Sequence, residues 1–171
     1  MHTSRITVAG VALIAALTGA CGPVDTASEP SNEDPAEKSP VAAKMGEAAK
    51  DGKFTFVVTD VSTRTESIGD EFVGREPQGK FVMVDVKVTN HATEAQGFLG
   101  SDQKLLASGN TYSADDEAAA YLPSSQSLYE QINPGNKVSG VVIFDVPRKV
   151  KPTAIELHDS AFSNGVRVDL K

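Results

Sequence analysis

The sequence predicts an all-β domain whose strands form a sandwich or a barrel. The segment Lys80–Asn90 places four valines on one face and larger or polar side chains on the other, and this period of two is typical of a β-strand. A second alternating segment, Val138–Val146, follows later in the chain. Clusters of glycine, proline and asparagine separate shorter strands. Strands do not alternate with helices along the chain, and this argues against a parallel sheet.

Length and composition limit the classes of protein to consider. A chain of 171 residues suits one domain better than two. It lacks tryptophan, and only 6% of its residues are aromatic, so the core must be mostly aliphatic. The formal net charge is −7. Because phosphate neutralisation needs clustered lysine and arginine, this charge argues against a nucleic-acid partner and against electrostatic docking on anionic lipid.

The first twenty residues have the pattern of a signal peptide. His2 and Arg5 precede the apolar run Ile6–Leu17, which is too short for a spanning helix of about 20 residues. Small residues follow, and then Cys21, the single cysteine of the chain. One cysteine can form neither an internal disulfide nor a cysteine-based zinc site.

The run Thr18-Gly19-Ala20-Cys21 resembles the lipobox of bacterial lipoprotein precursors, although Thr18 stands where a large aliphatic residue is usual. The resemblance implies cleavage before Cys21 and attachment of acyl chains such as palmitate to this residue. Two acyl chains on one residue give stable membrane attachment. We therefore expect a lipid anchor at Cys21 on the extracellular face of the cell membrane. The alternative is an ordinary secretory signal with a chance cysteine.

Residues 21–50 are expected to form a disordered linker. Four prolines alternate with small polar residues, and residues 22–40 carry five acidic side chains against the single Lys38. So little apolar surface cannot offset the entropy of ordering. Ala42–Ala49 is a weak helix candidate, because Gly46 interrupts it.

The folded domain is expected at residues 51–171. A polar loop is expected at Ser62–Gly79. The strands are expected, in order, at Lys53–Val61, Lys80–Asn90, Phe98–Leu99, Lys104–Ala107, Gln126–Ile132, Lys137–Val146, Ala154–His158 and Val166–Leu170.

One short helix is expected at Ser113–Tyr121. Ser113 is placed to cap its amino end, and the acidic residues that follow favour the positive end of the helix dipole. Pro123 is expected to end it.

The order of several motifs resembles a known family. The motifs are Gly79–Asn90, Gly109-Asn110-Thr111-Tyr112, Asn133-Pro134-Gly135 and Gly140–Pro147. Together they resemble the telokin-like, immunoglobulin-like domain of unknown function found in lipoproteins of Gram-positive bacteria, a group akin to a secreted mycobacterial immunogenic antigen. The resemblance implies an immunoglobulin-like antiparallel β-sandwich with one short helix, and it implies no activity.

The sequence nominates no catalytic residue, so we expect no enzyme. His158, Asp159 and Ser160 are adjacent, but neighbours in sequence rarely form a Ser-His-Asp site, and no GxSxG elbow occurs. His91 follows a strand end, where a loop histidine is ordinary. Ser101-Asp102-Gln103-Lys104 matches SxxK but lacks the KTG that accompanies it in penicillin-recognising enzymes.

No cofactor or metal site is predicted either. Asp102 and the turn Asp115-Asp116-Glu117 are candidates to hold calcium, but a capped helix with a solvated acidic turn is the simpler interpretation. Copper binding through Met45, Met83 and the two histidines has no supporting spacing. Gly97–Gly100 and Tyr121-Leu122 are candidates for an exposed apolar patch, and we expect Phe98 and Leu99 to enter the core instead.

These observations predict a lipid-anchored cell-surface binding or interaction module without catalytic activity. Its loops or an exposed sheet face would contact an envelope protein or a cell-wall partner. The alternative is an extracytoplasmic carrier of a small ligand or metal ion.

Overall fold

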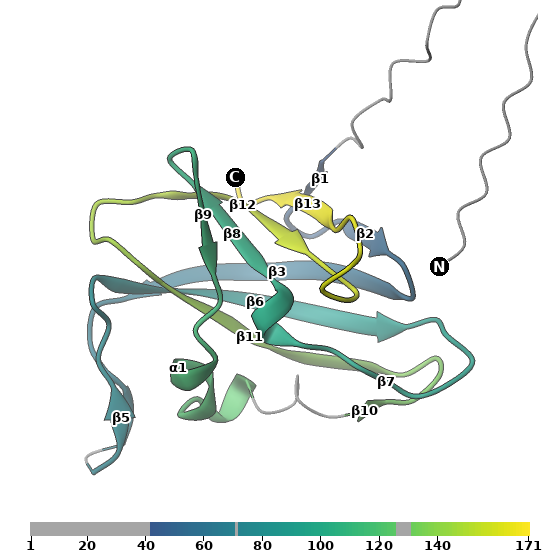
Figure 1. The fold of residues 1–171 in the computed structure, drawn as a ribbon, viewed down its shortest axis with the longest axis horizontal. Helices are drawn as coiled ribbons and strands as arrows, with labels where there is room; N and C mark the ends of the chain where they lie inside the picture. The colour runs from purple at the N-terminus through teal and green to yellow at the C-terminus, as the bar shows by residue number, and fades with distance from the viewer. Residues whose placement is uncertain (1–41, 71, 126–130) are drawn as a thin grey trace, which may run out of the picture. The chain divides into compact units, whose positions relative to one another are not determined.

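Two sheets pack face to face in the part of the chain that the structure describes, residues 42–70, 72–125 and 131–171 of a computed structural model (Figure 1). Sheet I has the strand order β11 (Lys137–Val146), β6 (Lys80–Asn90), β3 (Phe54–Arg64) and β2 (Ala48–Asp51). Sheet II has the order β1 (Ala43–Lys44), β13 (Val166–Asp169), β12 (Pro152–Leu157), β8 (Lys104–Ala107) and β9 (Asn110–Ser113). The predicted β-sandwich is confirmed.

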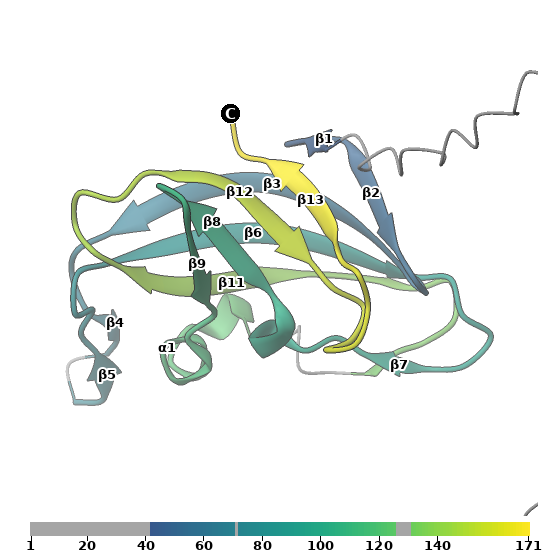
Figure 2. The same ribbon diagram turned by 45° about the horizontal axis from the view of Figure 1, so that its top comes forward.

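Nearly all of the strand pairs are antiparallel. The exception among the described strands is the two-residue pair of β1 with β13, which runs parallel. The smaller elements are β4 (Ile68–Gly69) with β5 (Gly74–Arg75), β7 (Gln96–Gly97) with β10 (Gln131–Ile132), the 3-10 turn η1 (Gly100–Asp102) and the helix α1 (Asp116–Ala120). Figure 2 shows the β4–β5 hairpin extending away from the sheets on the side where α1 lies.

Strand β6 lies at the centre of sheet I and carries the alternation that the sequence predicts. Its four valines, Val82, Val84, Val86 and Val88, are at most 1% exposed. Each contributes about 1.5–3 kcal/mol of burial free energy before chain entropy is counted. Three phenylalanines, Phe54, Phe56 and Phe98, pack beside them with ring centroids 5.8 to 6.2 Å apart. The main core therefore lies between the two sheets.

A second apolar cluster covers part of the outer face of sheet I. Val141 and Ile143 of β11 point away from the main core, yet both are buried, because α1 and Ile68 of the β4–β5 hairpin pack on them. Phe81 of β6 belongs to the same cluster. Over these residues β11 is therefore buried on both faces.

Several predicted boundaries differ from the structure. β1 and all of β2 except its last residue, Asp51, lie within residues 21–50, which were expected to be linker, so the fold begins before Asp51. Ala49 is buried and pairs with Phe56 of β3. The alanine-rich segment carries no alternation that indicates a strand, so its pairing with β3 decides its conformation.

The expected strand Phe98–Leu99 is also wrong, because the strand is Gln96–Gly97 and Phe98 leaves it to pack against the other phenylalanines. The helix is shorter than expected. Ser113 ends β9 by pairing with Lys104, and Asp115 caps the helix instead, accepting a hydrogen bond from the Ala118 amide.

The loop expected at Ser62–Gly79 contains the end of β3 and the whole β4–β5 hairpin. Residues 126–130 of the expected strand Gln126–Ile132 lie outside the described residues, as do the signal segment, Cys21 and the linker up to residue 41. No helix of the described part is long and apolar enough to cross a membrane.

Candidate functional site

The loop after β12 contains His158, Asp159 and Ser160, and the structure gives it a structural role. The His158 ring nitrogen Nδ1 lies 3.3 Å from the Ser163 carbonyl oxygen and 3.4 Å from its hydroxyl. Asp159 instead faces the β2–β3 turn, where its carboxylate accepts a hydrogen bond from the Lys53 amide at 3.1 Å. The three neighbours therefore form no Ser-His-Asp arrangement.

Asp159 connects the two sheets through this turn. The Lys53 ammonium lies 3.3 Å from the Asp159 carboxylate, and the Asp159 amide donates to Asp51 at 2.7 Å. Burial alone would raise the pKa of Asp159, but the hydrogen bonds from Lys53 and Ser160 and the Lys53 charge together lower it. Asp159 is therefore a negatively charged clamp at neutral pH.

The SxxK sequence also serves structure. The Lys104 ammonium lies 3.4 Å from the Ser101 carbonyl and 3.2 Å from the Ser113 hydroxyl, so its described contacts do not include the Ser101 hydroxyl. Between them in sequence, the buried Gln103 donates to the Leu99 and His158 carbonyls and accepts from the His158 amide at 2.7 Å. Gln103 thus joins the η1 turn to the loop after β12.

The acidic turn at the start of α1 is paired with an arginine. Arg75 of β5 lies 3.5 Å from the Asp115 carboxylate and forms a second ion pair with Glu117. Asp115 also caps the helix. Among the described residues, no three His, Cys, Asp or Glu side chains gather as metal ligands. The positive charge that pairs with this acidic turn is therefore the guanidinium group of Arg75.

The methionines and His91 lie in separate environments. Met83 packs against the second apolar cluster, and Met45 is 41% exposed between β1 and β2. His91 is exposed, and its amide donates to the Lys53 carbonyl. The structure therefore brings no copper-type ligand set together from these residues.

Two hollows of the described part are well enough formed to consider as binding sites. The larger, about 330 Å³, is an open depression lined by Gln78, Gly79, Asp145, Val146 and Pro147. Both carboxylate oxygens of Asp145 already accept backbone hydrogen bonds, from the amides of Gln78 and Gly79. The smaller, about 10 Å³, lies between α1 and β11 and has room for one water at most.

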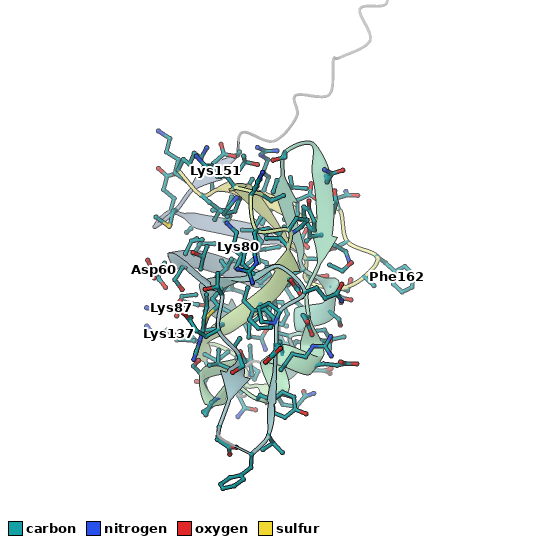
Figure 3. All side chains as sticks on the ribbon, turned by 90° about the vertical axis from the view of Figure 1, so that its left-hand side faces the viewer. Asp60, Lys80, Lys87, Lys137, Lys151 and Phe162 are labelled. Carbon is teal, nitrogen blue, oxygen red and sulfur yellow. The ribbon has the colours of Figure 1, made fainter. Side chains whose placement is uncertain are left out.

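The rest of the outer face of sheet I is polar. Figure 3 shows Asp60, Lys87 and Lys137 along one side of the molecule. Asp60 of β3 lies opposite Asp85 of β6. Burial, and secondarily the Asp60 charge, raise the pKa of Asp85. This part of the face presents charged side chains to solvent.

The most exposed large apolar side chains of the described residues lie at two loops. Phe72 and Val73, at the tip of the β4–β5 hairpin, are 90% and 57% exposed. Phe162, after β12, is 99% exposed and projects away from the sandwich (Figure 3). Of the apolar patch considered from sequence, Phe98 is buried as expected, whereas Leu99 is 55% exposed.

Sequence reasoning did not single out Phe72, Val73 or Arg75. The available signal was Phe72-Val73 in an otherwise polar loop, with a glycine on each side at Gly69 and Gly74. That pattern indicates a hairpin with an apolar tip. The pairing of Arg75 with the helix has no signal in sequence, because the partners are forty residues apart or more.

These features define a β-sandwich domain with structurally engaged polar clusters and exposed apolar loops. The chain belongs to the family described as Domain of unknown function (DUF4352), whose model matches residues 43–168. The family start at residue 43 agrees with the position of β1.

Solved structures share this fold at low sequence identity. The secreted protein MPT63 from Mycobacterium tuberculosis is 15% identical, with a TM-score of 0.58 covering 78% of this chain and 98% of that one. The yjhA protein from Bacillus subtilis is 14% identical, with a TM-score of 0.54 covering 75% and 99%. An uncharacterized beta-sandwich protein from Clostridium difficile is 14% identical, with a TM-score of 0.51 covering 81% and 100%. These likenesses show the fold alone.

A shorter match occurs to the isoquinoline 1-oxidoreductase subunit beta of Brevundimonas diminuta. It is 41% identical over 49 residues, which is 29% of this chain. The matched region spans 6% of that protein's length, so its activity does not carry over to this chain.

Proposed function

We propose that this protein is a lipid-anchored binding module without catalytic activity, displayed on the extracellular face of the cell membrane. One observation supports binding over catalysis. Several of the ionisable groups considered from the sequence are engaged in structural contacts, such as Asp115 with Arg75 and Asp159 with Lys53, whereas large apolar side chains are exposed on loops. An active site needs the reverse, with reactive groups free and aligned in a cleft.

The sequence of the first residues supports this location. A short apolar run ends in Gly19-Ala20-Cys21, and an acidic, proline-containing segment of about twenty residues separates it from β1. MPT63, which shares the fold, is described as a secreted protein. That description agrees with an extracytoplasmic position for this chain. The acidic segment would hold the sandwich away from the bilayer as a spacer.

The anchor is tested by fractionation of cells that make the full chain. Wild-type protein should partition with membranes and incorporate labelled palmitate, and globomycin should cause the precursor to accumulate. Cys21→Ser should abolish the label and release the chain from the membrane fraction. An unlabelled wild-type protein that ignores globomycin would show an ordinary secretory signal instead.

Binding is tested by affinity isolation of the tagged full chain from its own cell envelope after mild crosslinking. A binding module should enrich a specific protein or wall fragment over a tagged control lipoprotein. Enrichment of nothing would contradict the binding role even if the anchor is confirmed. The carrier alternative has weaker support, because the described hollows offer no enclosed polar cavity and no cluster of metal ligands.

A further inference from the structure

Five basic side chains gather at one end of the sandwich, where β3 ends, β6 begins and β11 turns into β12. They are Arg64, Lys80, Arg148, Lys149 and Lys151. Figure 1 places these three segments at the left-hand end of the domain, and Figure 3, which faces that end, shows Lys80 and Lys151 there. We call this surface the basic end. It reverses locally the sign of a chain whose net charge is −7.

The pairing of the strands brings these residues to the same end of the domain. Lys80 lies opposite Val146, the last residue of β11, and Arg64 lies opposite Phe81, the residue after Lys80. The three remaining cations follow Val146 within five residues. The basic end is therefore built by the register of sheet I and belongs to the folded domain.

The backbone beneath the basic end is held in place on both sides. In the turn after β11, the Val150 amide donates to the Pro147 carbonyl at 2.9 Å, and the Val150 side chain packs against the main core. In the segment before β6, the amides of Gln78 and Gly79 donate to the Asp145 carboxylate at 2.6 and 3.1 Å. Because these contacts fix the points from which the basic side chains extend, little backbone freedom is lost on binding.

The five cations are free to pair with a partner. Within the ranges that the structure describes, none of them forms an ion pair, whereas Lys53, Arg75 and Arg167 each do. Four of the five side chains are exposed, and the fifth, Lys80, is half-buried. Like charges that gather without counter-charges create a strong local positive potential, and this potential attracts anions.

The arrangement of the cations favours a long anion over a small one. They extend from three separate segments around the open hollow of about 330 Å³ that Gln78 and Pro147 border. A linear polymer with a charge at every repeat can contact several such cations at once. A phosphodiester polymer carries these charges in a flexible backbone, which can bend from one segment to the next.

The acidic residues beside the basic end disfavour a flat anionic surface. Glu66 and Glu76 continue from it toward the β4–β5 hairpin, and the rest of the chain is acidic on balance. A planar bilayer of anionic lipid would face these carboxylates together with the cations. A polymer thread can follow the cations alone.

We propose that the basic end binds a linear phosphodiester polymer of the cell envelope. This inference rests on the proposed binding function and specifies the surface and the chemistry of the partner. Arg64 and Arg148 each present a planar guanidinium group that can donate to two phosphate oxygens at once, and the three lysines add point charges. Binding releases the counterions of the polymer, so the affinity falls as salt is added.

The affinity is measured with the full chain, purified in a neutral detergent, and with synthetic poly(glycerol phosphate) as the probe. If all five cations contact phosphates, a plot of log binding constant against log salt concentration should have a slope of about −3.5, at about −0.7 per phosphate. Binding should then weaken roughly 100-fold between about 50 and about 200 mM salt. A binding constant that does not change with salt would overturn the proposal.

Arg148→Gln combined with Lys149→Gln and Lys151→Gln removes three of the five cations. This turn variant should bind about 100-fold more weakly than the wild type in about 0.1 M salt, with a slope reduced to about −1.4. All three side chains are exposed, so the melting temperature should stay at the wild-type value. An unchanged affinity in the turn variant would contradict the assignment of the basic end.

The matched control combines Lys50→Gln, Lys87→Gln and Lys137→Gln. These lysines lie in sheet I away from the basic end, and Figure 3 shows two of them, Lys87 and Lys137, on its outer face. The control changes the net charge as much as the turn variant does, yet it should keep the wild-type slope and affinity. Equal losses in the two variants would mean that binding responds to net charge alone, and the basic end would be wrong.

Two further ligands distinguish the phosphodiester polymer from other anions. Polygalacturonate carries carboxylates on stiff sugar rings and should bind more weakly than poly(glycerol phosphate). Equal affinity for the two polymers would overturn the phosphodiester assignment. The full chain should transfer from detergent equally to phosphatidylglycerol and phosphatidylcholine vesicles. A preference for phosphatidylglycerol that is lost in the turn variant would assign the basic end to the bilayer instead.

The outcomes separate this inference from the proposed function. If the wild-type chain isolates a specific envelope protein but does not bind poly(glycerol phosphate), the binding module stands and the polymer contact is wrong. If the wild-type chain isolates neither a protein nor a wall fragment and does not bind the polymer, both are wrong.

Discussion

Asp60 of β3 and Asp85 of β6 are cross-strand partners, so two carboxylates lie directly opposite one another on the outer face of sheet I. Like charges in this position destabilise a sheet. Burial is the larger cause, and the Asp60 charge the smaller, of a raised pKa at Asp85. The folded protein therefore holds the Asp85 proton more tightly than the unfolded chain does.

The first prediction concerns the pH dependence of this pair. With a raised folded pKa, stability is greatest below the unfolded pKa and falls as pH rises through the folded pKa. Asp85→Asn should therefore raise the urea midpoint at pH 7, and the gain should shrink toward pH 3. An unchanged midpoint at pH 7 would contradict this.

Asp60→Asn is the informative partner variant, followed by NMR titration of the Asp85 carboxyl. Removing the smaller cause should lower the Asp85 pKa only in part, since the burial remains. A full return to the ordinary aspartate value would assign the shift to charge alone.

The second prediction concerns the clamp between Asp159 and Lys53. The pKa of Asp159 is lowered, so its contribution is present above the unfolded pKa and is lost as pH falls through the folded pKa. Asp159→Asn should cost about 1.5–3 kcal/mol at pH 7, the range for hydrogen bonds to a charged group. The variant and wild type should converge at low pH in urea denaturation.

Asp169→Asn is the matched control, because Asp169 pairs with Arg167 at the surface, where both side chains are more than 40% exposed. Exposed pairs contribute little, so its midpoint should hardly change. Equal losses of stability in the two variants would show that the pair of Asp159 with Lys53 contributes no more than an exposed surface pair.

The third prediction concerns Gly52 in the turn that faces Asp159. Its φ is +51°, and a Cβ would lie 1.9 Å from the Asp159 carboxylate oxygen. Gly52→Ala should therefore cost about 1–2 kcal/mol for the left-handed backbone and more for displacing Asp159. Gly46→Ala isolates the backbone part, because Gly46 has a φ of +87° with nothing within 4 Å. Thermal unfolding should show the larger loss at Gly52, and equal losses would contradict the clash.

The fourth prediction concerns the buried Asn90 at the end of β6. Its side chain donates to the carbonyls of Glu94 and Ile132 and accepts from the Ala92 amide, all at 2.7 to 2.8 Å. Asn90→Ala would leave those backbone groups without partners, at a cost of about 2–4 kcal/mol. Asn110→Ala, at the exposed start of β9, should be nearly neutral. Urea unfolding of both variants provides the comparison.

A β-bulge in β3 explains why the outward position of Asp60 was not predictable from the sequence. The sequence places Phe54, Phe56 and Val58 on one face, and the structure confirms it. Strict alternation would then put Asp60 in the core. The register shifts between Val58 and Asp60, so Asp60 turns outward and Val61 packs toward the core. A bulge adds one unpaired residue, and nothing local in the sequence marks its position.

The exposure of apolar loop residues was only partly predictable for a related reason. The loop Gly97–Gly100 was considered from the sequence as an exposed apolar patch, and its Phe98 and Leu99 were expected to enter the core instead; Phe98 is buried, whereas Leu99 is 55% exposed. Whether the apolar residues of a loop are buried or exposed depends on which loops the sheets cover. Phe98 packs against Phe54 and Phe56, which are more than forty residues earlier.

By itself the sequence determined the all-β class and the central strand Lys80–Asn90, because alternation and turn residues act over a few positions. Only the tertiary structure decided that α1 covers the outer face of β11, that Arg75 pairs with the acidic turn, and that Phe72 stays exposed. These depend on which distant segments are brought together, and packing selects among arrangements that local preferences leave equal.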